Sequence, residues 1–185
     1  DGDTVALSNM QRQIVHSTNN LGKAKVLSAK ERMQGINPNI KIITYNEYMD
    51  AAALKKIIAE ENYDFIIEAT DNFDSKFVVN DVCVALKKAY SHAGVMQFQG
   101  ETMTYVPGHA CYRCVVPTIP DNLNPSKAIL GTVAGIIGTI QATEAIKYLL
   151  GIGNLLTDYL LIYDALFVDC RKLAISQNPN CICKD

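Results

Sequence analysis

Apolar runs of strand length alternate with segments of helical period along this chain. Residues 22–35 and 51–62 place apolar side chains at helical spacing, and the short run at residues 65–67 is typical of a buried strand. This alternation is characteristic of an α/β domain. The pattern further predicts helices over residues 75–86 and 132–150, strands over residues 40–43 and 89–94, an irregular stretch over residues 95–131, and a closing hairpin from residues 160–163 and 167–175.

The helix predicted over residues 132–150 is unusually apolar. The longest uncharged stretch, residues 128–143, contains Gln141 and three glycines, and it is shorter than the roughly 20 apolar residues that a transmembrane helix needs. We therefore interpret it as a buried helix and expect no membrane partner. Gly131, Gly135 and Gly138 would let this helix approach a neighbour closely.

Composition narrows the class of protein. The 185 residues include 17 Lys and Arg against 19 Asp and Glu, a net charge of −2, whereas a nucleic-acid-binding protein carries a basic footprint. With 49% hydrophobic residues, residues 1–185 suit a single folded domain. No signal-peptide pattern is recognised, so a cytoplasmic location is expected. Because the chain begins Asp1-Gly2-Asp3 without an initiator Met, we expect an N-terminally incomplete piece of a longer protein.

Polar residues of both charges gather near the N-terminus, within DGDTV, SNMQRQ and GKAK. An acid at a strand end, as Asp1 could be, commonly bonds a ribose hydroxyl in dinucleotide-binding folds. Arg12 offers a planar fork for phosphate oxygens and Lys25 a compact point charge. A nucleoside triphosphate site needs this mixture of acid and base. A solvated loop beside a charged helix face would explain the same residues, and a Walker A sequence is absent.

A second polar cluster, Thr70-Asp71-Asn72, follows the strand predicted at residues 65–67. Ligands of open α/β sheets bind outside the carboxyl ends of the strands, and Asp71 could hold Mg²⁺ against phosphate oxygens. The alternative is an Asx turn or a helix cap, although Asp74 already offers a cap to the next helix. The three histidines are scattered, without a paired nucleophile, so we assign none of them a catalytic role.

The six cysteines form a third cluster in the sequence. Cys111 and Cys114 make a C-x₂-C motif, and Cys181 and Cys183 make a second close pair near the C-terminus. Two close thiolate pairs favour a tetrahedral zinc site over disulfides, and a site with four thiolates is structural because no coordination position stays open. A redox C-x₂-C motif is the alternative, but such motifs normally begin a helix in a thioredoxin-like unit. The other two cysteines, Cys83 and Cys170, lie among apolar residues and are expected to be buried.

Taken in order, these motifs resemble the ThiF/MoeB/HesA family. The resemblance covers Asp1 to Cys183 and rests on DGDTV, SNMQRQ, GKAK, EATDN, CYRC, IQATEAIKYLLG and NPNCIC. It implies a Rossmann-like sheet with helices on both faces, a closing β-hairpin and a structural Zn²⁺ site, in a protein that is usually a homodimer. Members of this family are bacterial adenylyltransferases related to ubiquitin-activating enzymes. They use ATP and Mg²⁺ to adenylate the C-terminal Gly-Gly carboxylate of a small ubiquitin-like sulfur carrier protein.

The resemblance also implies roles for individual residues. It places Asp1 against the ribose, and it gives Lys25 a contact with phosphate. Residues 8–12 would line the triphosphate, with Ser8, Asn9 and Arg12 among them. Asp71, beside Asn72, would serve Mg²⁺ and phosphate, so that Arg12, Lys25 and Asp71 form the catalytic set. The cysteines that resemble the zinc ligands of the family are Cys111, Cys114, Cys181 and Cys183.

Three departures from the family pattern stand out. The family's Gly-rich phosphate loop, its first strand and a further Arg lie upstream of DGDTV, so we expect the chain as given to bind ATP weakly and not to adenylate. The final cysteine pair is C-x-C, where the family usually has C-x₂-C, which leaves the fourth ligand open. Residues 122–126 contain no Cys where members that form a persulfide or thioester carry one, so adenylation without covalent capture is expected.

The residues fit substitution at the α-phosphorus of ATP. A C-terminal carboxylate is ionised at neutral pH and needs no general base, so alignment and charge neutralisation remain as the work of the protein. Two other readings stay open: a dimeric scaffold that keeps the fold and the zinc without turnover, and an NAD-dependent oxidoreductase with the same α/β alternation. The combination of NMQRQ, ATDN and paired cysteines speaks against the oxidoreductase.

Overall fold

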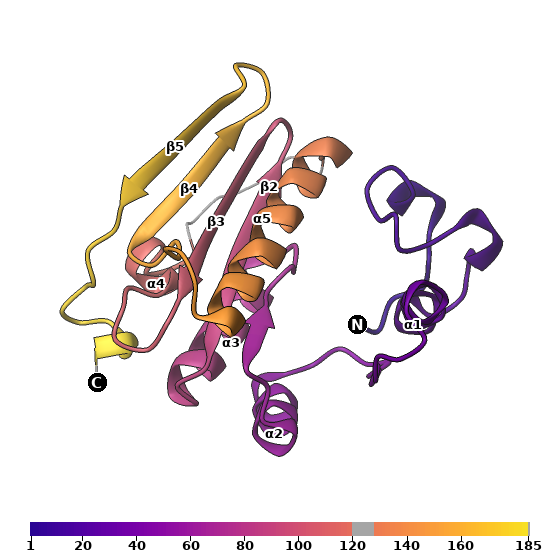
Figure 1. Ribbon diagram of the computed structural model, residues 1–185, viewed down its shortest axis with the longest axis horizontal. Helices are drawn as coiled ribbons and strands as arrows, with labels where there is room; N and C mark the ends of the chain where they lie inside the picture. The colour runs from indigo at the N-terminus through magenta and orange to yellow at the C-terminus, as the bar shows by residue number, and fades with distance from the viewer. Residues whose placement is uncertain (120–127, 185) are drawn as a thin grey trace. The chain divides into compact units, whose positions relative to one another are not determined.

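The computed structural model describes residues 1–119 and 128–184 (Figure 1). The chain separates into two compact units, Asp1–Asp50 and Ala51–Asp185, and each is described by itself. The departure noted for residues 122–126 lies outside the described residues. Within the described residues, no helix is both long and apolar enough to cross a membrane.

The first unit consists of two short 3-10 helices, η1 (Leu7–Asn9) and η2 (Thr18–Asn20), and the helix α1 (Lys25–Ile36). Two backbone bonds, from Val5 N to Lys23 O and from Lys25 N to Asp3 O, both 2.9 Å, join the N-terminal segment to the start of α1. α1 ends at Ile36, and Asn37, immediately before Pro38, is its C-cap residue. These contacts place residues 1–5 beside the first turn of α1.

The strand predicted over residues 40–43 is wrong, because this segment has no regular secondary structure. A strand needs a hydrogen-bonding neighbour, and the described part of this unit contains only an isolated bridge between Thr4 and Ala24. Ile40 and Ile43 remain exposed.

The second unit contains a five-stranded sheet with strands in the order β1-β2-β3-β4-β5. β1 (Phe65–Ile67) runs parallel to β2 (Ala89–Met96), and the other neighbours are antiparallel. The closing hairpin is confirmed as β4 (Tyr159–Asp164) and β5 (Asp169–Ala174). This arrangement places the carboxyl end of β1 beside the middle of β2.

The strand β3 (Gln99–Tyr105) lies within the segment predicted to be irregular. Its threonines, Thr102 and Thr104, are fully buried, which its polar sequence does not suggest. Burial is possible because both hydroxyls are bonded: Thr102 Oγ1 donates to His92 O at 2.6 Å, and Thr104 Oγ1 donates to Glu144 Oε2 at 2.7 Å. Partners outside the segment therefore permit a polar strand inside the sheet.

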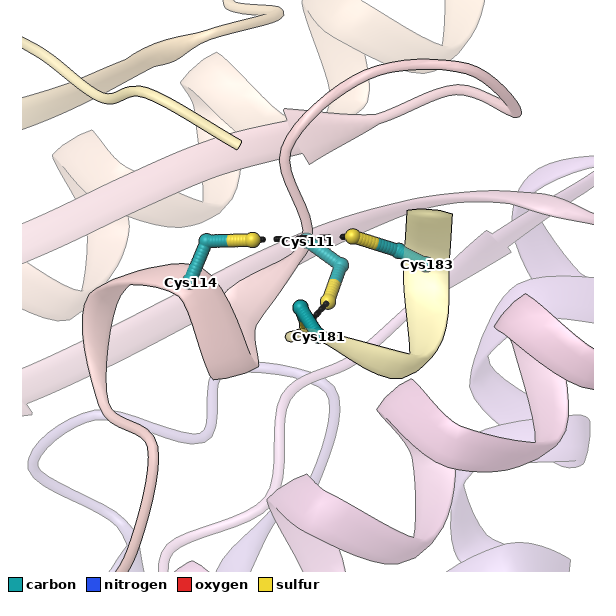
Figure 2. A group of neighbouring side chains, drawn as sticks. All are labelled: Cys111, Cys114, Cys181 and Cys183. Carbon is teal, nitrogen blue, oxygen red and sulfur yellow. Dashed lines mark hydrogen bonds between the residues drawn. The ribbon is translucent and has the colours of Figure 1, made fainter. Parts of the chain in front are cut away.

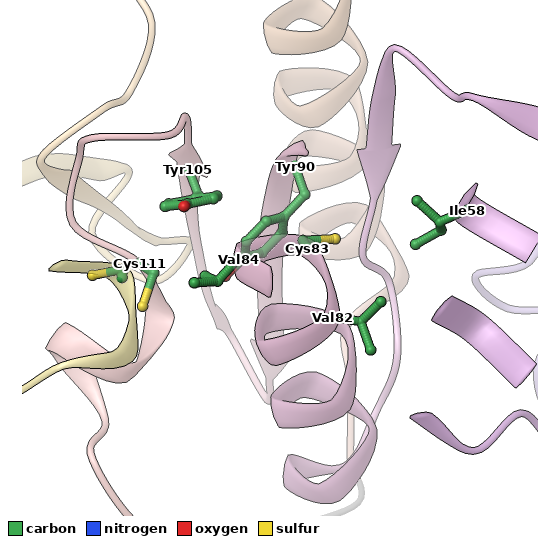
Figure 3. Packing of buried hydrophobic residues seen from close by; sticks show 8 residues of the cluster. Ile58, Val82, Cys83, Val84, Tyr90, Tyr105 and Cys111 are labelled. Carbon is green, nitrogen blue, oxygen red and sulfur yellow. The ribbon is translucent and has the colours of Figure 1, made fainter. Parts of the chain in front are cut away.

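Helices cover both faces of the sheet, as expected. On one face, α3 (Phe73–Ala85) packs on inward-facing residues such as Tyr90 (Figure 3). α4 (Tyr112–Val115) packs on Met103 on the same face. On the other face, α5 (Gly131–Leu150) packs through Val133 and Ile137 on Ala93. α2 (Ala51–Glu61) lies against α3, and the last 3-10 helix is η3 (Ile182–Lys184).

The close approach of α5 to the sheet comes from a strand glycine, Gly100, and not from Gly135 or Gly138 of the helix. A Cβ at Gly100 of β3 would lie 2.5 Å from Ile137 Cγ1, so only glycine fits under α5 there. A Cβ at Gly135 or Gly138 would meet no heavy atom of the described chain within 4 Å. These two positions lie on the side of α5 that points away from the sheet.

Candidate functional site

An open hollow of 460 Å³ lies on the first unit, and three predicted nucleotide-binding residues, Asp1, Arg12 and Lys25, line it. Two segments form its walls: the loop at residues 12–16 and the start of α1 at residues 25–29. Lys25 begins α1, so the first helical turn lies beside the same hollow, and the N–H groups of Lys25, Leu27 and Ser28 already donate to Asp3 O and Ala24 O. A helix N-terminus and two cationic side chains together suit an anionic ligand.

Lys25 is paired inside the unit. Its Nζ lies 2.7 Å from Asp3 Oδ2, and the Tyr48 hydroxyl donates to the other oxygen of Asp3. The hydrogen bonds from Lys25 and Tyr48 lower the pKa of Asp3, which keeps its carboxylate ionised. Asp1 Oδ1 in turn accepts a bond of 2.9 Å from Asp3 N. The local sequence does not mark Asp3 as a site residue, since its partner Tyr48 lies 45 residues away along the chain.

The 3-10 helix η1 and the turn after it position Arg12. Arg12 Nη1 donates to Ser8 O at 3.3 Å, which turns the guanidinium toward η1. Ser8 and Asn9 are not among the residues that line the hollow. Gln13 and His16 line it instead, and Gln13 Oε1 is a buried acceptor that has no hydrogen-bond partner among the described residues. Burial, followed by the charge of Lys25, lowers the pKa of His16.

Asp71 and Asn72 belong to the second unit and follow the end of β1 after three residues, 68–70. Asn72 Oδ1 accepts a bond of 2.8 Å from Ser75 N and so caps α3. The prediction that Asp74 caps this helix is wrong, because Asp74 lies inside the first turn. Asn72 has the extended backbone of an N-cap residue, and its amide oxygen satisfies a free N–H of the helix. Asn72 Nδ2 also donates to Asp71 Oδ1 at 3.3 Å, and the Asp71 carboxylate is exposed.

A buried polar cluster that sequence analysis did not identify lies immediately before Asp71. It consists of Glu68 after β1, Lys76 on α3 and His92 on β2, all at least nine-tenths buried. Lys76 Nζ lies 3.1 Å from Glu68 Oε2, and His92 Nδ1 lies 2.8 Å from the same oxygen. Burial raises the pKa of Glu68, but the hydrogen bond from His92 and the charge of Lys76 outweigh burial and bring the pKa to about 2.

The four cysteines predicted as metal ligands converge in the second unit (Figure 2). Cys111 Sγ and Cys181 Sγ are 3.5 Å apart, as are Cys114 Sγ and Cys183 Sγ, and all four sulfurs lie within 4.8 Å of one another. A tetrahedral zinc site with Zn–S bonds of about 2.3 Å separates its sulfurs by about 3.8 Å. The donor set therefore fits Zn²⁺, and both members of the C-x-C pair belong to it.

The chain around the cysteines supports this geometry. Cys111 is the N-cap residue of α4 and Cys183 lies on η3, so the cluster joins the middle of the chain to its C-terminus. Asn178 N donates to Cys114 Sγ at 3.4 Å, and Gln177 Nε2 donates to Cys183 O at 2.9 Å. Burial raises the pKa of the Cys114 thiol to about 11, so a bound metal would have to displace its proton.

The remaining two cysteines differ from each other. Cys83 is fully buried beside Tyr90, as expected (Figure 3). The expectation that Cys170 is buried is wrong, since Cys170 is exposed on β5. β5 is an edge strand, and apolar neighbours in sequence do not bury a residue that no element covers.

These features define a class of protein: an α/β domain in which helices sandwich a mixed sheet and a four-cysteine cluster ties the C-terminal segment to α4. The ThiF family profile matches residues 1–184. The chain belongs to the ThiF family.

Curated relatives are about one third identical to this chain over the aligned residues. The sulfur carrier protein adenylyltransferase of Thermus thermophilus is 35% identical over 194 residues, covering 99% of this chain and 71% of that protein. The molybdopterin-synthase adenylyltransferase of Escherichia coli is 35% identical over 185 residues, covering 98% of this chain and 74% of that protein. The SAMP-activating enzyme E1 of Haloferax volcanii is also 35% identical. The relatives are thus named adenylyltransferases or activating enzymes.

Solved structures agree on the fold. The crystal structure of E. coli MccB with MccA superposes with a TM-score of 0.81 at 21% identity, covering 99% of this chain. The chain spans 57% of the length of that MccB chain. The structure of PaaA gives a TM-score of 0.79 at 22% identity.

Proposed function

We propose that the protein containing this chain adenylates the C-terminal carboxylate of a small ubiquitin-like sulfur carrier protein, with ATP as the nucleotide donor. The observation that supports this most directly is the hollow of the first unit, where Asp1, Arg12 and Lys25 lie together beside the start of α1. The relatives that are named sulfur carrier and molybdopterin-synthase adenylyltransferases support the same chemistry. The reaction class matches a site that contains cations but no activated nucleophile.

In the proposed reaction, the carrier carboxylate attacks the α-phosphorus of ATP and pyrophosphate leaves, so an acyl-adenylate forms. The carboxylate is already ionised at neutral pH, and the residues of this chain therefore act on charge and position. We assign Arg12 and Lys25 to the phosphates, Asp1 to the ribose, and Ser8 and Asn9 to the triphosphate segment. Asp71, beside Asn72, is assigned to Mg²⁺, which prefers carboxylate oxygen and would screen phosphate charge.

The proposal includes Zn²⁺ in the cysteine cluster as a structural ion. Four thiolates would complete its coordination, so the ion would contribute to folding and take no part in the reaction. The convergence of four sulfurs within 4.8 Å supports this assignment.

Exchange of labelled pyrophosphate into ATP tests the proposed activity. In the full-length protein, we expect exchange that depends on a carrier with an intact Gly-Gly C-terminus and stops when those two glycines are removed. Carriers of the thiamine type and of the molybdopterin type, assayed side by side, would identify the pathway. Nucleotide binding without exchange for any carrier would contradict the proposal and favour a non-catalytic scaffold.

A homodimer is the second part of the proposal. It is supported by the outer side of α5, where Ile146, Leu149 and Leu150 are each more than half exposed, at 56%, 59% and 63%. Contiguous exposed apolar surface of this kind commonly marks an interaction site, and Gly135 and Gly138 leave space there for a second backbone.

A further inference from the structure

Burying the polar groups of Glu68, Lys76 and His92 carries a free-energy cost. Each residue is at least nine-tenths buried, and burying charged groups costs several kcal/mol per ion, which a pair recovers only with good geometry and further hydrogen bonds. Apolar residues of similar size would often serve stability equally well. If the cluster has a role beyond packing, the groups that its hydrogen bonds position should indicate that role.

Three of these bonds end on one residue, Thr70. Thr70 N donates to Glu68 Oε1 at 2.6 Å, and Thr70 Oγ1 donates to the same oxygen at 2.5 Å. Lys76 Nζ donates to Thr70 O at 2.7 Å, and it also bonds Glu68 and the carbonyl of Ala93. Both backbone polar groups of Thr70 and its hydroxyl are therefore held by the Glu68–Lys76 pair.

The Glu68 end of this segment is also held from the opposite face of the sheet. Gln141 of α5 donates through Nε2 to Glu68 O at 2.8 Å and to Ser91 O at 3.1 Å. His92 Nδ1, 2.8 Å from Glu68 Oε2, fixes the orientation of the carboxylate itself. After Thr70, the next constraint along the chain is the N-cap at Asn72, so Asp71 is the exposed residue between two fixed points.

We infer that Glu68 and Lys76 are positioning residues, which fix the backbone of Thr70 and thereby the direction of the Asp71 carboxylate toward a Mg²⁺–phosphate ligand. This inference rests on the proposed function, since that assigns Mg²⁺ to Asp71. Neither residue touches the ligand. Their effect is on geometry, and a displacement of about 1 Å at a reacting centre costs on the order of 10²-fold in rate.

The test replaces Lys76 and follows the Mg²⁺ dependence of pyrophosphate exchange in the full-length protein. Lys76→Met keeps a similar side-chain length and removes the bond to Thr70 O together with the bonds to Glu68 and to Ala93 O. We expect kcat to fall on the order of 10²-fold, and the Mg²⁺ concentration for half-maximal rate to rise about tenfold. Lys76→Arg keeps the charge and the donors, and it should recover most of both. Thr70→Val, which removes only the hydroxyl bond, supplies a milder variant if Lys76→Met does not fold.

Glu144→Gln is the matched control. Glu144 is as buried as Glu68 and likewise accepts from a threonine hydroxyl and a backbone N–H, those of Thr104 and Leu156. Among the described residues, none of its bonds goes to residues 68–72. It should lower the melting temperature without moving the Mg²⁺ dependence. A Lys76→Met protein with wild-type Mg²⁺ dependence, or a Glu144→Gln protein with the same shift, would overturn the inference.

A second readout separates this inference from the proposed function. Hydrogen exchange at the Thr70 amide, which Glu68 holds, should be at least tenfold faster in Lys76→Met than in wild type and unchanged in Glu144→Gln. If the wild-type protein shows no pyrophosphate exchange but the Thr70 amide behaves in this way, the proposed function fails and the positioning of Thr70 stands. If the amide is equally protected in all three proteins, the positioning role fails whatever the activity.

Discussion

Replacing one cysteine of the four-sulfur cluster tests how this fold holds its C-terminus. We choose Cys181→Ser, because Cys181 is half of the C-x-C pair and its sulfur lies 3.5 Å from that of Cys111. The wild-type chain should contain one Zn²⁺ per molecule, with Zn–S distances of about 2.3 Å by X-ray absorption. Cys181→Ser should lose most of this zinc, since a thiolate ligand is replaced by a poorly matched hydroxyl.

The contacts of the cysteine cluster indicate how much stability Cys181→Ser should remove. The cluster joins η3 to α4, and Cys111 and Cys183 are part of the buried core around Tyr90 and Tyr105, so losing the metal releases a core segment. Metal loss ranks with the largest single-substitution effects, about 4 kcal/mol. For a domain of this size, each kcal/mol lowers Tm by about 2–4 °C. We therefore expect Tm to fall by roughly 8–16 °C.

Cys170→Ser is the matched control, since Cys170 is exposed on β5 and lies outside the cluster. A surface substitution changes stability by about 0.5 kcal/mol or less, so its zinc content should be unchanged and Tm should shift by at most about 2 °C. Metal content by mass spectrometry and Tm by calorimetry measure both variants. Cys181→Ser protein with full zinc, or metal-free wild-type protein with an unchanged Tm, would refute the reasoning.

Three further outcomes are expected. Arg12→Ala in the full-length protein should lower carrier-dependent pyrophosphate exchange on the order of 10²-fold by removing charge stabilisation in the transition state, and wild-type rates would remove Arg12 from the site. Ile146→Glu should convert the proposed homodimer to a monomer in light scattering at micromolar concentration, whereas a wild-type monomer would contradict the dimer itself. The third outcome concerns unfolding by acid. The folded-state pKa of Glu68 is lowered to about 2 from an ordinary 4.5. The stabilisation of the folded state by the ionised Glu68 carboxylate is therefore complete above about pH 4.5 and is lost as the pH falls toward 2. It amounts to about 3 kcal/mol, so Glu68→Gln should flatten acid unfolding over that range, and an unchanged slope would show that the carboxylate does not contribute.

Local signals in the sequence were enough to find most of the elements. Helical spacing predicted α1, α2, α3 and α5, and short apolar runs predicted β1, β2 and the closing hairpin, because their periodicity reflects which side chains face the core. The paired cysteines indicated a metal cluster for a similar reason, since close spacing brings two ligands of each pair together without help from the rest of the fold. The family motifs indicated the same fold.

Contacts between residues far apart in the sequence determined the elements that local signals did not predict. β3 escaped prediction because Thr102 and Thr104 are buried by partners on β2 and α5, and only those hydrogen bonds make a polar strand tolerable. Residues 40–43 have strand-like sequence but no strand neighbour among the described residues of their unit. A strand forms only where a neighbouring strand can bond it, and the sequence of a segment does not show whether such a neighbour is present.

The buried polar cluster likewise depends on contacts between residues that are far apart in the sequence. Glu68, Lys76 and His92 are 8 to 24 residues apart in sequence, and nothing in their local pattern distinguishes them from solvated charges. Folding brings β1, α3 and β2 together, and the resulting burial turns three ordinary side chains into one hydrogen-bonded cluster. Whether a charged residue faces water or another charge depends on which elements pack around it, so that information appears only when the chain has folded.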